Sequence, residues 1–219
     1  MKTNSHIKLI VVMLVVIALT TIGALYFVMK NKDAINGSIK VVKIDGVFLP
    51  QPQEISDFEL TDNHGKPYTK SNLKGHWTFV FFGFTNCGMV CPTTLSELNK
   101  MYKTLEKELP ANQMPHIVLI SVDPDRDTVE RMNDYVSVFN THFIGLRGGE
   151  SKIDVLKKQL HIASVKMQTD QGKDHYTINH SAEIMVFNPQ VQLQAFFSYP
   201  HIANQMVRDY KLILTSTKG

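Results

Sequence analysis

Cysteine is scarce in this chain. Only two cysteines, Cys87 and Cys91, occur among its 219 residues. A framework of several disulfides is therefore excluded. A single bridge between these two would close a very short loop, and the stability that a disulfide contributes grows with loop length. We therefore interpret the pair through the chemistry of two thiols rather than as a structural staple.

An excess of basic charge is also missing from most of the chain. The formal net charge is +3, from 23 basic and 20 acidic residues. Residues 1–30 contain Lys2, Lys8 and Lys30 and no acid, which leaves 20 basic and 20 acidic residues in 31–219. Nucleic-acid binding domains usually carry a basic face or stripe. The sequence therefore gives no indication of a nucleic-acid partner.

Charge is absent altogether from the run Leu9–Met29. As a helix, this run would be about 31 Å long, close to the thickness of the bilayer hydrocarbon. A cleaved signal peptide is the alternative, but its apolar core is usually about 7–15 residues and ends at an A-x-A-like site. We expect an uncleaved, single-pass anchor in a bacterial inner membrane, with the following domain in the periplasm.

Apolar runs and amphipathic stretches alternate along the rest of the chain. They predict strands at 77–83, 116–122, 143–146, 182–187 and 191–197. They predict helices after residue 91, from 128, at 149–161 and at 200–214, with a hairpin at 165–178. This order predicts an α/β fold with a mixed central sheet flanked by helices. We divide the chain into an anchor (1–30), a linker (31–47) and a folded domain (48–219).

The cysteine pair lies where a predicted buried strand gives way to a helix. Helical i,i+4 spacing would place the two Cα atoms roughly 6 Å apart, close enough for a disulfide. A helix N-terminus also favours the thiolate, which is the reactive and metal-binding form. Two thiolates suit Cu(I), whereas Cu(II) or Zn(II) would need a third ligand. The pair is a redox couple, a metal clamp, or both.

Histidine is the natural third ligand, and His180 is the best placed of the nine. It directly precedes a predicted core strand, at the end of the hairpin, so the hairpin can bring it to a distant site. His175 is a substitute on the same segment. Among the acids, Asp123 ends a buried strand and could orient a site group, whereas Asp127 is expected to cap a helix. Met89, between the cysteines, is the methionine worth testing as a ligand.

Four sequence blocks together resemble the Sco/SenC family of membrane-anchored, thioredoxin-fold copper chaperones. The resemblance covers about residues 48–215, with the blocks in the family's order. They are Gly83-Phe-Thr-Asn-Cys87-x-x-x-Cys91-Pro92, Ser121-Val-Asp-Pro-Asp-Arg-Asp-Thr128, Phe143-Ile-Gly-Leu146 and Asn179-His180-Ser181.

This resemblance implies a thioredoxin-like domain that binds Cu(I), Cu(II) or both through Cys87, Cys91 and His180. Family members deliver copper to the copper-A site of cytochrome c oxidase, or reduce its thiols. We expect a metallochaperone rather than an enzyme, with the copper-A subunit or another copper protein as its partner. The alternative is a thiol–disulfide oxidoreductase that uses the cysteines as a catalytic redox pair. A weaker reading is a peroxidase-like scaffold, which needs one activated thiol.

The chain departs from the family pattern at two places. The family often has proline and an acid between the cysteines, where Gly88, Met89 and Val90 stand here. It usually has aspartate before the histidine, where this chain has Asn179. The loss of two carboxylates should make the site less anionic, so we expect a shift in preference from Cu(II) toward Cu(I).

Overall fold

The computed structural model describes residues 3–30, 43–168 and 176–216, and the chain divides into two compact units, 1–40 and 41–219. In the first unit, helix α1 (Thr3–Lys30) is continuous. Its segment Ile7–Lys30 has a mean hydropathy of 2.7. The helix is therefore long and apolar enough to be a candidate membrane span, as the sequence predicts.

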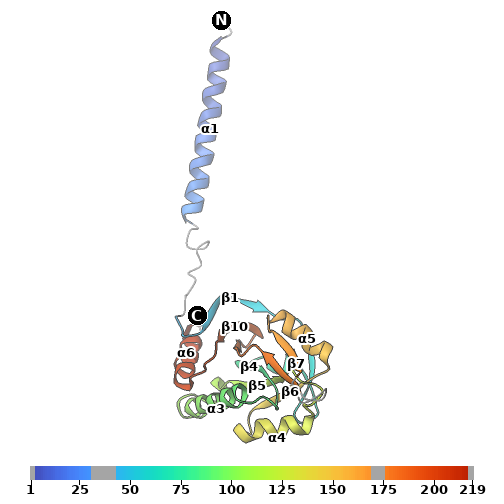
Figure 1. Ribbon diagram of the computed structural model, residues 1–219. Coiled ribbons are helices and arrows are strands. Elements are labelled where there is room, and N and C mark those ends of the chain that lie inside the picture. Colours follow the sequence, from blue (N-terminus) through green and yellow to red (C-terminus); the bar gives the residue numbers. More distant parts are fainter. Residues whose placement is uncertain (1–2, 31–42, 169–175, 217–219) are drawn as a thin grey trace. The chain divides into compact units, whose positions relative to one another are not determined.

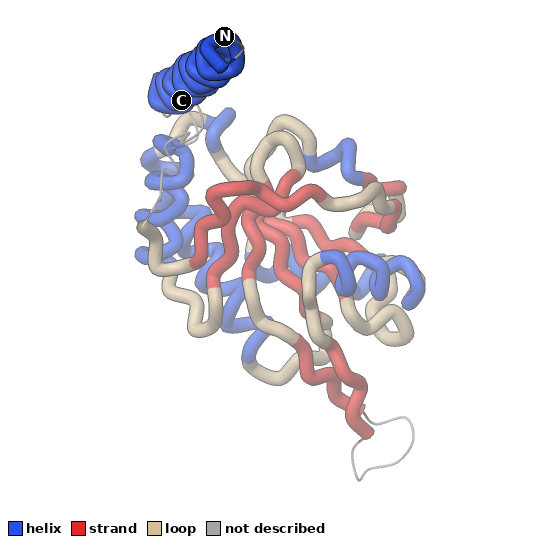
Figure 2. The backbone as a smooth tube through the Cα atoms, turned by 90° about the horizontal axis from the view of Figure 1, so that it is seen from above, coloured by secondary structure: helices blue, strands red, loops and turns tan. Residues whose placement is uncertain are grey.

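The second unit is built on a mixed sheet. Within the described residues, eight strands lie in the order β1-β10-β9-β4-β5-β6-β2-β3. The sheet that they form is drawn in Figures 1 and 2. Their bounds are β1 (Val47–Glu54), β2 (Glu59–Asp62), β3 (Pro67–Thr69), β4 (Thr78–Gly83), β5 (His116–Ser121), β6 (Ile144–Arg147), β9 (Ile184–Phe187) and β10 (Gln192–Phe197). The pairs β4–β5 and β5–β6 are parallel, and the other pairs are antiparallel. The predicted mixed sheet is confirmed.

Four helices complete the described part of this unit. They are α3 (Val90–Glu108), α4 (Val129–Phe139), α5 (Glu150–Gln159) and α6 (Ala203–Ser216). Two short 3-10 turns are also present: η1 (Lys70–Leu73) joins β3 to β4, and η2 (Ala111–Gln113) joins α3 to β5.

Strand β4 is buried over its whole length because helices cover both faces of the sheet. On one face, the ring of Phe79 meets that of Tyr210 in α6, with 5.4 Å between the ring centroids. On the other face, Val80 lines the same small internal cavity as Leu156 of α5. This two-sided burial explains why the strand is an almost uninterrupted apolar run rather than an alternating one.

A separate pair of strands stands outside the main sheet. Strands β7 (Ser164–Gln168) and β8 (Tyr176–His180) pair antiparallel and extend from the domain (Figure 2). They form the two sides of the predicted hairpin, whose polar tip lies outside the described residues. The last residue of β8 is His180, so this pair carries the histidine toward the rest of the unit.

Candidate metal centre

The cysteines lie between the central strand and the helix that follows it. Cys91 is in the first turn of α3, while Cys87 lies in the loop before the helix. The pair therefore lacks the i,i+4 helical geometry that its spacing suggests. The loop instead turns back, with the amide of Cys87 donating a hydrogen bond to the carbonyl of Phe84 at 3.2 Å. This turn brings the Cys87 thiol next to that of Cys91.

The imidazole of His180 is fixed between two aromatic rings. Its centroid lies 6.0 Å from that of Phe81 and 5.8 Å from that of Phe84, both in edge-on contacts. Its Nδ1 lies 2.7 Å from the carbonyl oxygen of Ser181. Because a carbonyl only accepts, Nδ1 carries the proton in this contact. The other ring nitrogen, Nε2, lies 3.5 Å from the Sγ atom of Cys91 and is the one available as a metal ligand.

These three side chains converge on one point. The ligand atoms of Cys87, Cys91 and His180 all lie within 4.8 Å of one another. Three ligands bound to one ion at about 2.0–2.3 Å would be about 4 Å or less apart, so only a small closure is needed. In the described part of the chain, no other three His, Cys, Asp or Glu residues gather in this way. His175 lies outside the described residues.

The pKa values of the two thiols are shifted in opposite directions. The hydrogen bond from Cys91 lowers the pKa of Cys87. The hydrogen bond between Cys87 and His180 lowers it further. The same contact with Cys87, together with burial, raises the pKa of Cys91. One thiolate therefore forms readily at Cys87 while Cys91 keeps its proton. Incoming metal would displace that proton.

Burial distinguishes the cysteines as well. Cys91 has 0% of its surface exposed, whereas Cys87 is partly exposed. A Cβ atom added at Gly83 would come within 3.0 Å of the Cys91 Sγ atom, which shows how closely β4 packs against this sulfur. Met89 is 78% exposed at the helix start, and its predicted role as a ligand stays a prediction.

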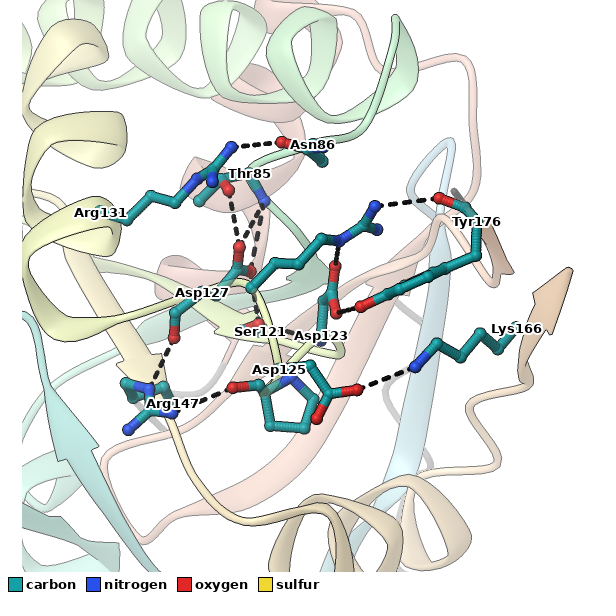
Figure 3. Close-up of polar contacts among 12 residues, drawn as sticks. Thr85, Asn86, Ser121, Asp123, Asp125, Asp127, Arg131, Arg147, Lys166 and Tyr176 are labelled. Atoms are coloured by element: carbon teal, nitrogen blue, oxygen red, sulfur yellow. Dashed lines mark hydrogen bonds and ion pairs between the residues drawn. The ribbon is translucent and has the colours of Figure 1, made fainter. Parts of the chain in front are cut away.

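The expectation for Asp127 is wrong. Thr128 caps α4, with its side chain accepting a hydrogen bond from the amide of Arg131. Asp127 is instead fully buried and accepts hydrogen bonds from the hydroxyls of Thr85 at 2.6 Å and Ser121 at 2.5 Å (Figure 3). Burial raises the pKa of its carboxyl group. An acid just before a helix is a sequence signal for an N-cap, but the residue that caps α4 is the next one in the chain, Thr128.

Sequence reasoning missed two other residues near the centre, Arg126 and Tyr176. Both contact Asp123. Figure 3 shows the hydroxyl of Tyr176 directed at the Asp123 carboxylate. A signal was available for Tyr176. It lies four residues before His180, and alternate residues of a strand share a face.

The arrangement can be compared with known proteins. The family model SCO1/SenC matches residues 49–215. The chain belongs to the SCO1/SenC family. It is 34% identical over 154 residues to a protein from Stutzerimonas stutzeri named as copper-binding, covering 70% of this chain and 74% of that protein.

Solved SCO1/SenC structures share the fold, including two determined with copper bound. ScoI of Bradyrhizobium japonicum is 33% identical, with a TM-score of 0.63 over 71% of this chain and 96% of that one. ScoI of Arabidopsis thaliana is 28% identical, with a TM-score of 0.67 over 73% of this chain and 98% of that one. The thioredoxin-like fold expected from the resemblance is confirmed.

Proposed function

We propose that this protein binds a copper ion as cargo through Cys87, Cys91 and His180. The observation that carries the proposal is the convergence of two sulfurs and one imidazole nitrogen within 4.8 Å. Soft sulfur ligands select copper in its reduced state, and an imidazole also suits the oxidised state. The copper-bound SCO1/SenC relatives support copper as the metal.

The site suits transfer as well as binding. Copper held by two thiolates and one nitrogen can leave when the thiolates of another protein replace these ligands one by one. Binding requires both thiols in reduced form, because a Cys87–Cys91 disulfide, formed with loss of two protons and two electrons, removes both sulfur ligands. The redox state of the pair would thus decide whether copper is bound.

The family resemblance and the apolar helix support a proposal for the recipient of the copper and for the location of the protein. We propose that the domain, residues 48–219, passes copper to the copper-A site of cytochrome c oxidase. Helix α1 would anchor it to the inner membrane through residues 1–30, with 31–47 as the linker and the domain on the periplasmic side. The length and hydropathy of Ile7–Lys30 support the anchor.

A thiol–disulfide reductase is the second candidate function, and the unequal thiols favour it. A lowered pKa makes Cys87 the attacking thiolate, and buried Cys91 would resolve the mixed disulfide. In that reaction the partner disulfide gains two electrons and two protons, and the Cys87–Cys91 pair is oxidised. This chemistry needs no metal.

Substitution of His180 separates the two functions. In the full-length chain in detergent, we expect His180→Ala to weaken copper retention, above all that of Cu(II), because only two sulfur ligands remain. Reduction of a partner disulfide should continue, because both thiols are intact. Copper content after dialysis and the rate of thiol release measure the two activities.

His64→Ala is the matched control, because it removes an exposed imidazole from a turn of the same domain. It should leave both activities unchanged. If His180→Ala binds copper as the unmodified chain does, His180 is not a ligand and the proposed ligand set is wrong. If it loses disulfide reduction as well, the two functions are not separable at this residue.

A further inference from the structure

One short loop contacts both halves of the candidate metal centre. Residues 122–128, here named the aspartate loop, follow strand β5. At one end, the carboxylate of Asp127 accepts hydrogen bonds from the backbone amide and hydroxyl of Thr85, two residues before Cys87. Asp123, near the start of the loop, and Arg126, next to Asp127, both contact Tyr176, four residues before His180. The loop therefore connects the cysteine segment to the histidine strand.

Tyr176 contacts the aspartate loop through its hydroxyl, its backbone carbonyl and its ring. Its hydroxyl donates a hydrogen bond to Asp123 Oδ1 at 2.6 Å, and its carbonyl oxygen accepts one from Arg126 at 2.9 Å. The Arg126 guanidinium lies 3.7 Å from the centroid of the Tyr176 ring and pairs with Asp123 Oδ2 at 2.5 Å. Asp123 is 1% exposed, so its charge is desolvated and these contacts are strong ones.

Strand β8 itself links this attachment to the imidazole, because Tyr176 is its first residue and His180 its last. Tyr176, Ile178 and His180 alternate along β8 and therefore point to one face. Ile178 is buried on that face, whereas Thr177 and Asn179 between them are exposed. A slip of β8 by one residue would turn His180 away from the sulfurs. Tyr176 opposes such a slip because its hydroxyl and its carbonyl are both bound to the aspartate loop.

The aspartate loop is itself held in place. Arg147 of β6 donates hydrogen bonds to the carbonyl oxygens of Asp127 at 2.6 Å and Pro124 at 3.1 Å (Figure 3). These bonds fasten both the middle and the end of the loop to the main sheet. The loop can therefore serve as a rigid spacer between the strand that carries His180 and the segment that carries Cys87.

We propose that Tyr176 is a positioning residue for His180. Through Asp123 and Arg126 it fixes β8 at the distance from the cysteines at which the imidazole completes the copper site. The inference rests on the proposed function, since it assigns Tyr176 a role through a ligand of that site. It also gives the buried Asp123 a purpose other than contact with the metal.

Tyr176→Phe tests this role, because it removes one hydroxyl and keeps the ring. In the full-length chain in detergent, we expect Cu(II) binding to weaken about 10- to 100-fold, as when other groups that orient metal ligands are lost. Cu(I) binding, which depends mainly on the thiolates, should change far less. Titration with Cu(II) followed by thiolate-to-copper absorption and electron paramagnetic resonance, and competition with a chromophoric Cu(I) chelator, measure the two.

The decisive comparison is with the double variant. If Tyr176 acts through His180, adding Tyr176→Phe to His180→Ala should have no further effect on copper binding. An equal loss in both backgrounds would mean that Tyr176 supports the fold in general, and would overturn the proposal. Tyr68→Phe is the matched control, because the buried Tyr68 hydroxyl has no hydrogen-bond partner among the described residues and belongs to the distant strand β3.

A second pair of variants guards against a change in folding. Asp123→Asn keeps an oxygen that accepts the Tyr176 hydroxyl, whereas Asp123→Ala does not, so the asparagine variant should retain more Cu(II) affinity. Equal losses in the two would contradict the proposal. If Tyr176→Phe binds Cu(II) normally while His180→Ala does not, the positioning role fails and the proposed function stands. If His180→Ala itself binds normally, the proposed function fails.

Discussion

The two halves of the candidate metal centre are held by different means. The cysteine half lies between β4 and α3, where Phe81 and Leu95 have no exposed surface. The histidine half lies on a strand pair outside the main sheet, with most of β7 exposed. Apolar packing encloses the first half, whereas the second half depends on two ring contacts of His180 and on the polar contacts of Tyr176. The histidine half should therefore be the more easily displaced by single substitutions.

The largest expected effect comes from removing a sulfur. We expect Cys87→Ala to lower Cu(I) affinity by more than roughly 100-fold, which is the most that loss of a positioning contact costs. The reason is that one of the two sulfur ligands is removed. His180→Ala should lower Cu(I) affinity less. Competition with a Cu(I) chelator measures both. A greater loss from His180→Ala would reverse the assigned importance of the two halves.

The pH dependence of thiol reactivity sharpens the contrast within the cysteine half. The pKa of Cys87 is lowered, so its reactive thiolate persists as the pH falls below the ordinary thiol range. Between pH 8 and 6, alkylation of Cys87 should stay nearly constant, while an ordinary thiol slows about tenfold per pH unit below its pKa. Cys91, whose pKa is raised, should stay unmodified throughout.

Peptide mass spectrometry after timed alkylation of the metal-free protein would follow each cysteine separately. His180→Ala should restore part of the pH dependence, because His180 contributes to the low pKa of Cys87. A parallel decline of Cys87 and a model thiol would contradict the assignment of Cys87 as the thiolate.

Much of the cysteine half could be predicted from the sequence, because its parts are adjacent in the chain. A buried strand followed by a proline near a helix start indicates the junction that carries Cys87 and Cys91. The loop geometry of Cys87 could not be predicted, because i,i+4 spacing does not reveal where the helix begins.

The histidine half depends on contacts between distant segments. The position at the end of the hairpin and the family resemblance both indicated His180, yet its approach to Cys91 joins residues 89 positions apart. The role of Asp127 was misjudged for the same reason, because its partner Thr85 is 42 positions away. A helix cap is a local feature, so the sequence can indicate it. The burial of a carboxylate against a distant segment depends on the fold, so the local sequence does not indicate it.

The smallest expected effect lies at the exposed edge of the histidine half. Lys166 pairs with Asp125 at 2.8 Å and lies 3.8 Å from the centroid of the Tyr176 ring, at the solvent-exposed surface. Lys166→Ala should cost no more than about 1 kcal/mol of unfolding free energy and leave Cu(II) binding almost unchanged. Lys152→Ala, which breaks the exposed pair with Glu59, is the matched control. Denaturant unfolding and Cu(II) titration measure the result, and a loss as large as that of Tyr176→Phe would place Lys166 among the positioning groups.

The unequal burial of the two sulfurs gives ligand exchange a direction. Cys91 has no surface that another molecule can touch, while Cys87 is partly open to solvent. On the side of the ring away from the sulfurs, Nδ1 of His180 is bound to the Ser181 carbonyl. In the proposed transfer, a competing thiolate would therefore meet the copper beside Cys87, and the bond to the buried sulfur of Cys91 would break last.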